Sequence, residues 1–225
     1  APYDLEAPKY WAPLDGKYKH VTGPVDAKYH SAGKMLFPRM WSSADSKHID
    51  FYESYMNGKG TAVQGSKHKK PTQLANLSFF FDYQLNWMYW RYFLWNFAGR
   101  QNDIHGPTPN IFYGNWESGI KALDEVRLGD QSAGPDILSK NKGKNHYYML
   151  PLLLGLLGLF FQFDRDKRGS WLVFLLFFMT GIAIVMYLNQ QPMQVRERDY
   201  VYAGSFYAFA IWCGLGMAAI YTWIT

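Results

Sequence analysis

Hydrophobic and polar positions divide the chain into two unlike parts. The C-terminal part, residues 147–225, contains three uncharged and strongly apolar runs at 147–163, 171–188 and 201–225. A bilayer core of about 30 Å is crossed by about 20 apolar residues in a helix, with a range of about 17–25. The pattern therefore predicts three transmembrane helices.

Charge in the short connections indicates an orientation for these spans. The turn DRDKRGS between the first two carries Arg165, Lys167 and Arg168, against two basic residues in the connection at 189–200. Short basic loops are typical of the cytoplasmic side of a membrane. We therefore expect residues 100–146 and 189–200 to be extracytoplasmic.

Small residues recur along the last predicted span. Ala210, Gly214 and Ala218 are spaced by four and so share one face of a helix. Such a stripe allows another helix to approach closely in a membrane. The spacing predicts that this face is where the last span packs.

Residues 1–146 are polar and loop-rich, with one exception at 79–97, where eleven of nineteen side chains are aromatic. At 100° per residue, one polar stripe is predicted, made of Asp82, Asn86, Tyr89, Phe93, Asn96 and Arg100. Gln84 and Arg91 fall on the opposite side. A lipid-exposed span would tolerate polar groups on both sides at high cost, so we predict a helix in the interface or packed on the bundle, and a true span stays the alternative. Gly99 is expected to end it in the left-handed conformation.

Composition excludes several classes of protein. With 19% aromatic and 18% charged residues in 225, the chain is unlike a disordered one. The single cysteine, Cys213, excludes a disulfide scaffold and a multi-cysteine metal site. The six histidines show no paired-ligand spacing, and nucleotide-binding and hydrolase motifs are absent. No cofactor is evident from the sequence, which leaves open whether a divalent metal takes part. Because the chain begins at Ala1 and ends in an apolar run, we expect it to be a fragment of a larger protein.

Charged residues gather in one loop of the apolar part, within PMQVRERDYVYAGSFY at 192–207. The guanidinium groups of Arg196 and Arg198 can bind phosphate through two hydrogen bonds. The carboxylates of Glu197 and Asp199 can deprotonate a hydroxyl, which makes both catalytic candidates. A structural alternative stays open, in which Asp199 caps the last helix and the arginines anchor at headgroups or pair with these carboxylates.

Several long segments resemble one known family: SFFFDYQLNWMYWRYFLWNFAGRQNDI, NHYYMLPLLLGLLGLFFQ, FFMTGIAIVMYLNQQPMQVRERDYVYAGSFYAFAIWCGLG and PRMWSS. The family consists of bacterial multi-pass membrane proteins, catalogued as domain of unknown function 2723 and described as protein O-mannosyltransferase-like. The resemblance covers most of residues 36–225 and the C-terminal portion of the family. It implies a GT-C membrane glycosyltransferase, which passes sugar from a polyprenyl-phosphate donor to an extracytoplasmic hydroxyl.

The resemblance also implies which residues share a surface. FAGRQND at 97–103 and RERDY at 196–200 would face the extracytoplasmic side. The substrate-binding candidates are Arg100, Asn102, Asp103, Arg196, Arg198 and Tyr200. The acidic residue that GT-C enzymes carry in their first extracytoplasmic loop has no match in this chain.

The expected protein is thus mainly α-helical: a polar, loop-rich extracytoplasmic region followed by three transmembrane helices, part of a larger GT-C-like bundle. We expect it in the bacterial inner membrane. Its expected partners are membrane lipid, a polyprenyl-phosphate sugar donor and a protein or glycan acceptor, and no nucleic acid. The alternative function is a non-enzymatic membrane scaffold or envelope-complex subunit. A transporter is disfavoured, because ionisable residues are missing from the three spans.

Overall fold

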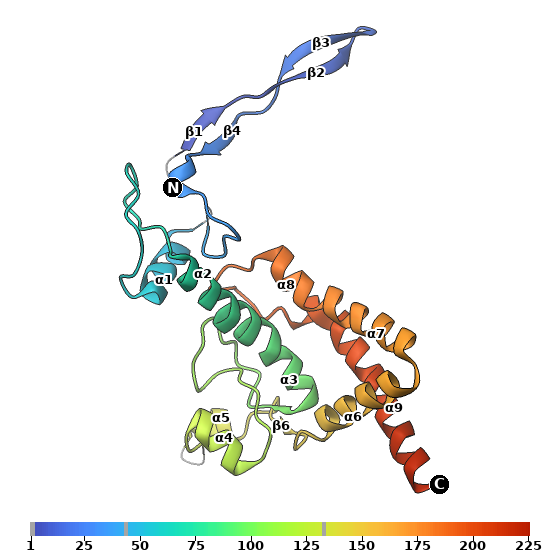
Figure 1. The fold of residues 1–225 in the computed structure, drawn as a ribbon. Coiled ribbons are helices and arrows are strands. Elements are labelled where there is room, and N and C mark those ends of the chain that lie inside the picture. The colour runs from blue at the N-terminus through green and yellow to red at the C-terminus, as the bar shows by residue number, and fades with distance from the viewer. Residues whose placement is uncertain (1–2, 43–44, 132–133) are drawn as a thin grey trace. The chain divides into compact units, whose positions relative to one another are not determined.

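The computed structural model describes residues 3–42, 45–131 and 134–225 (Figure 1). Ser43, the last residue of PRMWSS, lies outside these ranges. The chain divides into two units, Ala1–Phe79 and Phe80–Thr225. Residues 80–146, expected to belong with the polar part, thus pack with the apolar helices.

The first unit begins with a two-stranded antiparallel ribbon, drawn in blue in Figure 1. Strand β1 (Tyr3–Glu6) pairs with β4 (Asp26–Tyr29), and β2 (Lys9–Leu14) pairs with β3 (Lys17–Thr22). The turn between β2 and β3 places Asp15 and Gly16 at φ of 53° and 71°. Two positive φ values match the turns that suit the twist of a hairpin. The scattered polar residues of this region had predicted loops.

The rest of this unit contains a short 3₁₀ helix, η1 (Ser31–Gly33), and two α-helices, α1 (Ser46–Met56) and α2 (Gln73–Phe79). Asp45 caps the N-terminus of α1, because its carboxylate accepts a hydrogen bond from Lys47 N. The fully buried side chain of Asn76 holds the preceding chain segment: its Oδ1 accepts from the backbone N–H groups of Arg39 and Met40 at 2.7 and 3.1 Å. Buried polar groups need such partners.

The aromatic segment of the second unit is a π-helix, η2 (Phe80–Trp90), followed by α3 (Arg91–Phe97). Its i→i+5 hydrogen bonds wind the chain more loosely than an α-helix. The predicted stripe is therefore wrong: Asp82, Asn86 and Asn96 are exposed, whereas Tyr89 and Phe93 are buried. The expected packing on the bundle is present, because Phe93 contacts Phe209 with ring centroids 4.8 Å apart.

The helix ends just before Gly99, as predicted, but Gly99 does not adopt the predicted αL conformation. Its φ is 137°, and it lies in the short strand β5 (Gly99–Arg100), which pairs with β6 (Asn145–His146). A Cβ here would lie 2.4 Å from Glu117 O, so only glycine fits. Helices α4 (Lys121–Leu128) and α5 (Asp136–Ser139) lie between the two strands in sequence.

The apolar part forms α6 (Leu150–Arg165), α7 (Lys167–Thr180), α8 (Ile182–Leu188), the short 3₁₀ helix η3 (Asp199–Tyr202) and α9 (Ala203–Ile224). By length and composition, two helical stretches are able to cross a membrane, Lys167–Leu188 and Asp199–Ile224. Helix α6 has 16 residues, or about 24 Å, and is shorter than a bilayer core. Of the three predicted spans, two thus correspond to helical stretches that are long and apolar enough to cross a membrane.

Large apolar side chains on these helices point outward. Exposed fractions reach 69% for Phe160, 70% for Leu172, 86% for Tyr187 and 67% for Trp223. In the most apolar windows of the two long stretches, 17% and 33% of the residues are buried. Helices in the core of a soluble protein are mostly buried, so this pattern favours contact with lipid.

Helices α6 and α9 meet through glycines. A Cβ on Gly158 would lie 1.8 Å from Trp212 O, and one on Gly216 would lie 2.1 Å from Leu154 O. The predicted contact face of Ala210, Gly214 and Ala218 is wrong, because all three are exposed and Gly214 has open space around its Cβ position. The buried face of α9 instead carries Ala208, Trp212, Gly216 and Ala219.

We predict that Gly158→Ala lowers the thermal unfolding midpoint of the protein purified in detergent, whereas Gly214→Ala leaves it unchanged. The added methyl group must push α6 and α9 apart, and overpacking of this kind costs about 1–3 kcal/mol. Thermal unfolding followed by tryptophan fluorescence provides the measurement. Equal midpoints for the two variants would contradict the glycine contact.

Candidate functional site

The charged loop is tied to the aromatic helix by a buried ion pair. Arg91, whose side chain is 2% exposed, places Nη2 2.8 Å from Glu197 Oε2. Its Nε donates to Trp87 O at 2.9 Å and its Nη1 donates to Gly114 O at 2.7 Å. The rings of Trp87, Tyr92 and Trp95 surround the guanidinium, with centroids 4.2–4.7 Å away. The buried positive charge is therefore compensated on every side.

The Glu197 carboxylate, like the Arg91 guanidinium, has several hydrogen-bond partners. Besides Arg91, its carboxylate accepts hydrogen bonds from Tyr92 OH and from Gly106 N, the latter at 2.9 Å. Burial alone would raise the pKa of the Glu197 carboxyl, but the hydrogen bonds and charge of Arg91, with Tyr92 and Gly106, lower it below 4.5. An ionised carboxylate with occupied oxygens is a poor proton acceptor. The geometry favours an anchoring role for this catalytic candidate.

Asp199 is placed differently from its neighbour. It is the first residue of η3, and neither η3 nor α9 has a side chain bonded to its N-terminal N–H groups. The alternative in which Asp199 caps the last helix is therefore wrong. Within residues 3–42, 45–131 and 134–225, the Asp199 carboxylate forms no hydrogen bond. Its oxygens are open to solvent or to a ligand.

Residues 100–103 interact electrostatically with the charged loop at 196–200. Burial lowers the pKa of the Arg100 guanidinium, and the charges of Asp103, Asp199 and Glu197 oppose that shift. Arg100 also donates from Nε to Asn102 O at 2.9 Å and lies over the Trp95 ring. Arg100 thus lies within electrostatic reach of Glu197 and Asp199 in the charged loop.

Arg196 and Arg198, the two arginines of the charged loop, have guanidinium N–H groups without a carboxylate partner among the described residues. Arg196 is exposed and donates from Nη2 to Tyr200 OH at 3.2 Å. Arg198 uses its backbone N–H to donate to Tyr92 OH, and its buried Nε has no hydrogen-bond partner among the residues that the structure describes. The expected pairing of these arginines with Glu197 and Asp199 does not occur. An anion could accept hydrogen bonds from both guanidinium groups.

Asn102 has a different role from the one predicted. Its side chain is fully buried, its Oδ1 accepts from Ile104 N and Gly114 N, and its Nδ2 donates to Phe112 O. The amide holds the loop at 102–114 and has no free group for a substrate. Asp103, in contrast, is exposed.

Sequence reasoning missed Arg91, Tyr92 and Gly106 as parts of this site. A charged residue inside an aromatic helix was the available signal, because such a residue needs a buried partner. The partner lies 106 residues further along the chain, beyond any local pattern. Among the described residues, no group of three or more His, Cys, Asp or Glu side chains is placed to hold a metal ion.

Comparison with known proteins gives one match. A model described as a family of unknown function (DUF8416) matches residues 2–81, which is about a third of the chain. No curated protein and no solved structure is significantly similar to the chain. The match falls on the first unit, and the resemblance to O-mannosyltransferase-like proteins stays a prediction.

We predict that Glu197→Gln destabilises the protein at pH 7 by about 3 kcal/mol, because it leaves the buried Arg91 charge unpaired. The depressed pKa of Glu197 stabilises the fold above pH 4.5, and this contribution is lost as the pH falls through the folded-state value. The difference between wild type and variant should therefore shrink as the pH falls below 4.5 and through the folded-state pKa of Glu197. Denaturant unfolding over a series of pH values measures it.

Asp103→Asn is the matched control, since it neutralises an exposed carboxylate of the same region. It should change the unfolding free energy by less than about 0.5 kcal/mol. A Glu197→Gln effect that stays constant from pH 7 down to the pH at which the fold is lost would contradict the ion-pair assignment.

Proposed function

We propose that this chain is part of an integral membrane glycosyltransferase. The enzyme transfers sugar from a polyprenyl-phosphate donor to a hydroxyl of a protein or glycan on the extracytoplasmic face of the bacterial inner membrane. The observation that carries the proposal is the arrangement at the start of α9. There, Arg198 has an unpaired buried Nε and the neighbouring Asp199 carboxylate has no hydrogen bond within the described chain.

The position of these groups suits a lipid-linked phosphate. Asp199 begins the helical stretch Asp199–Ile224, which is long and apolar enough to cross a membrane. The polar end of such a helix lies where lipid headgroups and their phosphates are found. Arg196 and Arg198 would hold the donor phosphate there, with Arg100 supplying a further positive charge from the neighbouring segment.

Asp199 is a better candidate than Glu197 for the residue that orients or deprotonates the acceptor hydroxyl. Glu197 is held ionised and bonded by Arg91, Tyr92 and Gly106, so it has little capacity to take a proton. Asp199 has open oxygens, follows Arg198 directly in the chain and lies within electrostatic reach of Arg100. We assign it the role of orienting or deprotonating the acceptor. Asp103 and Tyr200, both exposed, would contact substrate at the edge of the same region.

The proposed protein crosses the membrane more than once, with residues 100–146 and 189–200 outside and the α6–α7 turn in the cytoplasm. We predict that a cysteine at position 167, on a Cys213→Ser background, resists an impermeant thiol reagent added to intact cells. A cysteine at position 196 should react readily under the same conditions. Labelling of position 167 from outside would overturn the topology.

We predict that Arg198→Lys and Asp199→Asn each reduce sugar transfer by the full-length protein about 10- to 150-fold. Lysine keeps the charge of Arg198 but loses its planar pair of donors, and a charged hydrogen bond contributes about 1.5–3 kcal/mol. Asparagine cannot accept the proton of a hydroxyl. Transfer from a polyprenyl-phosphate donor in isolated membranes is the measurement.

Arg165→Lys, in the opposite connection, is the matched control and should leave transfer unchanged. Wild-type transfer by Arg198→Lys and Asp199→Asn, with normal insertion, would remove the loop from the chemistry. It would favour the second function, a membrane scaffold or envelope-complex subunit. The contacts of Glu197 with Arg91 and Gly106 favour this second function, because they give at least one charged residue of the loop a structural role.

A further inference from the structure

The first unit carries most of the positive charge of the protein. Its residues 30–79 contain seven lysine and arginine residues against three carboxylates, a net charge of +4 in a chain whose total is +5. The ribbon at 3–29, in contrast, has four lysines and four carboxylates. The excess charge of this unit therefore follows the ribbon in the chain.

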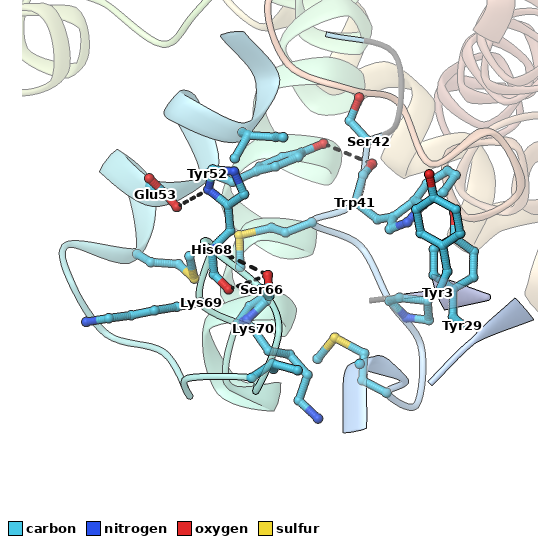
Figure 2. Close-up of a pocket in the computed structure, with 18 residues that line it drawn as sticks. Tyr3, Tyr29, Trp41, Ser42, Tyr52, Glu53, Ser66, His68, Lys69 and Lys70 are labelled. Atoms are coloured by element: carbon cyan, nitrogen blue, oxygen red, sulfur yellow. Dashed lines mark hydrogen bonds and ion pairs between the residues drawn. The ribbon is translucent and has the colours of Figure 1, made fainter. Parts of the chain in front are cut away.

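Four of these lysines belong to the loop between α1 and α2, residues 57–71, which has no carboxylate (Figure 1). They are Lys59, Lys67, Lys69 and Lys70. Lys69 Nζ donates to Gly58 O at 3.1 Å, and Lys70 Nζ donates to Ala32 O at 2.8 Å. Carbonyl acceptors leave the charge uncompensated, and no carboxylate of the described chain forms an ion pair with these lysines. Figure 2 shows the ends of Lys69 and Lys70 pointing outward, away from the pocket of this unit.

Two exposed leucines lie beside this loop. Leu36 and Leu74 are 84% and 78% exposed, the highest values among the large apolar side chains described in this unit. Lys70 Nζ also donates to Lys34 O at 3.3 Å, and Gln73 Nε2 donates to Leu36 O at 2.9 Å. These contacts bring the segment that holds Leu36 against the end of the basic loop and the start of α2. Apolar side chains and positive charge are therefore neighbours on the surface of the unit.

This combination fits the interface of an anionic bilayer. Amphipathic surfaces that lie on membranes place leucines at the boundary of the acyl chains and lysines at the headgroups. A bilayer presents a continuous negative surface, so the lysines need not converge on one point. A nucleic acid would contact the lysines but has no use for aliphatic side chains, because it is bound through phosphates, base edges and stacking. The two helical stretches able to cross a membrane would also hold this chain near a bilayer.

We propose that residues 34–36, 57–71 and Leu74 form a surface that binds the interface of an anionic lipid bilayer. Leu36 and Leu74 enter the region between headgroups and acyl chains, and the lysines lie at the lipid phosphates. The proposal does not rest on the proposed sugar transfer, because it concerns a different unit and its test measures no transfer.

Fluorescence of the full chain reconstituted in lipid vesicles tests the proposal. A nitrobenzoxadiazole label is attached to a cysteine at position 74 on a Cys213→Ser background. The vesicles contain either phosphatidylcholine alone or about two parts phosphatidylcholine to one part phosphatidylglycerol. We expect emission at shorter wavelength, and quenching by doxyl-labelled lipid, in the anionic vesicles only. Sodium chloride at about 0.5 M should reverse both effects, because it screens the charges.

The double variant Lys59→Gln, Lys67→Gln tests the charge of the surface. Both lysines are exposed, and the hydrogen bonds of Lys69 and Lys70 that hold the loop stay intact. Each lysine removed should lower the ratio of bound to free unit about fivefold, so the pair should lower it about 25-fold. Lys9→Gln with Lys17→Gln is the matched control, since it removes two exposed lysines from the electrically balanced ribbon.

Leu36→Ser, measured with the label at position 74, tests the apolar part. Loss of an inserted leucine should lower the ratio of bound to free unit at least about fivefold. Val25→Ser is the matched control, because Val25 is an exposed apolar residue of the ribbon, outside the proposed surface.

Four results would overturn the proposal. Equal quenching in pure phosphatidylcholine would remove negative charge from the recognition, and absence of quenching in both kinds of vesicle would remove the lipid. Equal losses in the two double variants would reduce the effect to net charge. Submicromolar binding of a DNA duplex that the Lys59→Gln, Lys67→Gln variant loses would assign the lysines to nucleic acid instead.

Discussion

The ion pair between Arg91 and Glu197 joins three parts of the second unit that are far apart in the sequence. Arg91 comes from the aromatic helix, Glu197 from the charged loop, and Gly106 and Gly114 from the intervening segment that bonds to both. A buried pair stabilises a fold only when its remaining donors and acceptors are also bonded. Here the backbone groups of Trp87, Gly106 and Gly114 meet that need. The loop before α9 and the segment after α3 are consequently held together.

The ion pair separates the charged loop into one residue that anchors it, Glu197, and three charged residues that can bind a ligand, Arg196, Arg198 and Asp199. Glu197 points into the protein, so Arg196 and Arg198, on either side of it in the chain, are left without carboxylate partners. Asp199 follows directly and lies within electrostatic reach of Arg100. Anchoring at one position therefore presents two arginines and a carboxylate at the start of an apolar helix. The proposed phosphate site depends on that arrangement.

The sequence predicts well what composition alone dictates. Long apolar runs such as 171–188 became helices, because a chain without charges in such a stretch must satisfy its backbone internally. The extracytoplasmic position of 97–103 and 196–200, which the family resemblance implies, stays a prediction. The break at Gly181 and the short α6 were not predicted, since run length says nothing about local winding.

Three features were beyond sequence reasoning for physical reasons. The partner of Arg91 depends on tertiary contacts, which no periodicity reports. The π-helix at 80–90 changes which residues share a face, so the stripe through Tyr89 failed. The contact of α6 with α9 uses Gly158 and Gly216, although Gly214 looks equally suitable in the sequence.

The central claim is that Arg91 and Glu197 hold the segments at 99–116 and 196–200 together as one structure. Hydrogen–deuterium exchange of wild type and Arg91→Met measures it most directly, at residues 99–116 and 196–200. The account predicts that both segments gain exchange together in the variant, including the Gly106 amide that donates to Glu197. Faster exchange in one segment with unchanged protection in the other would contradict it.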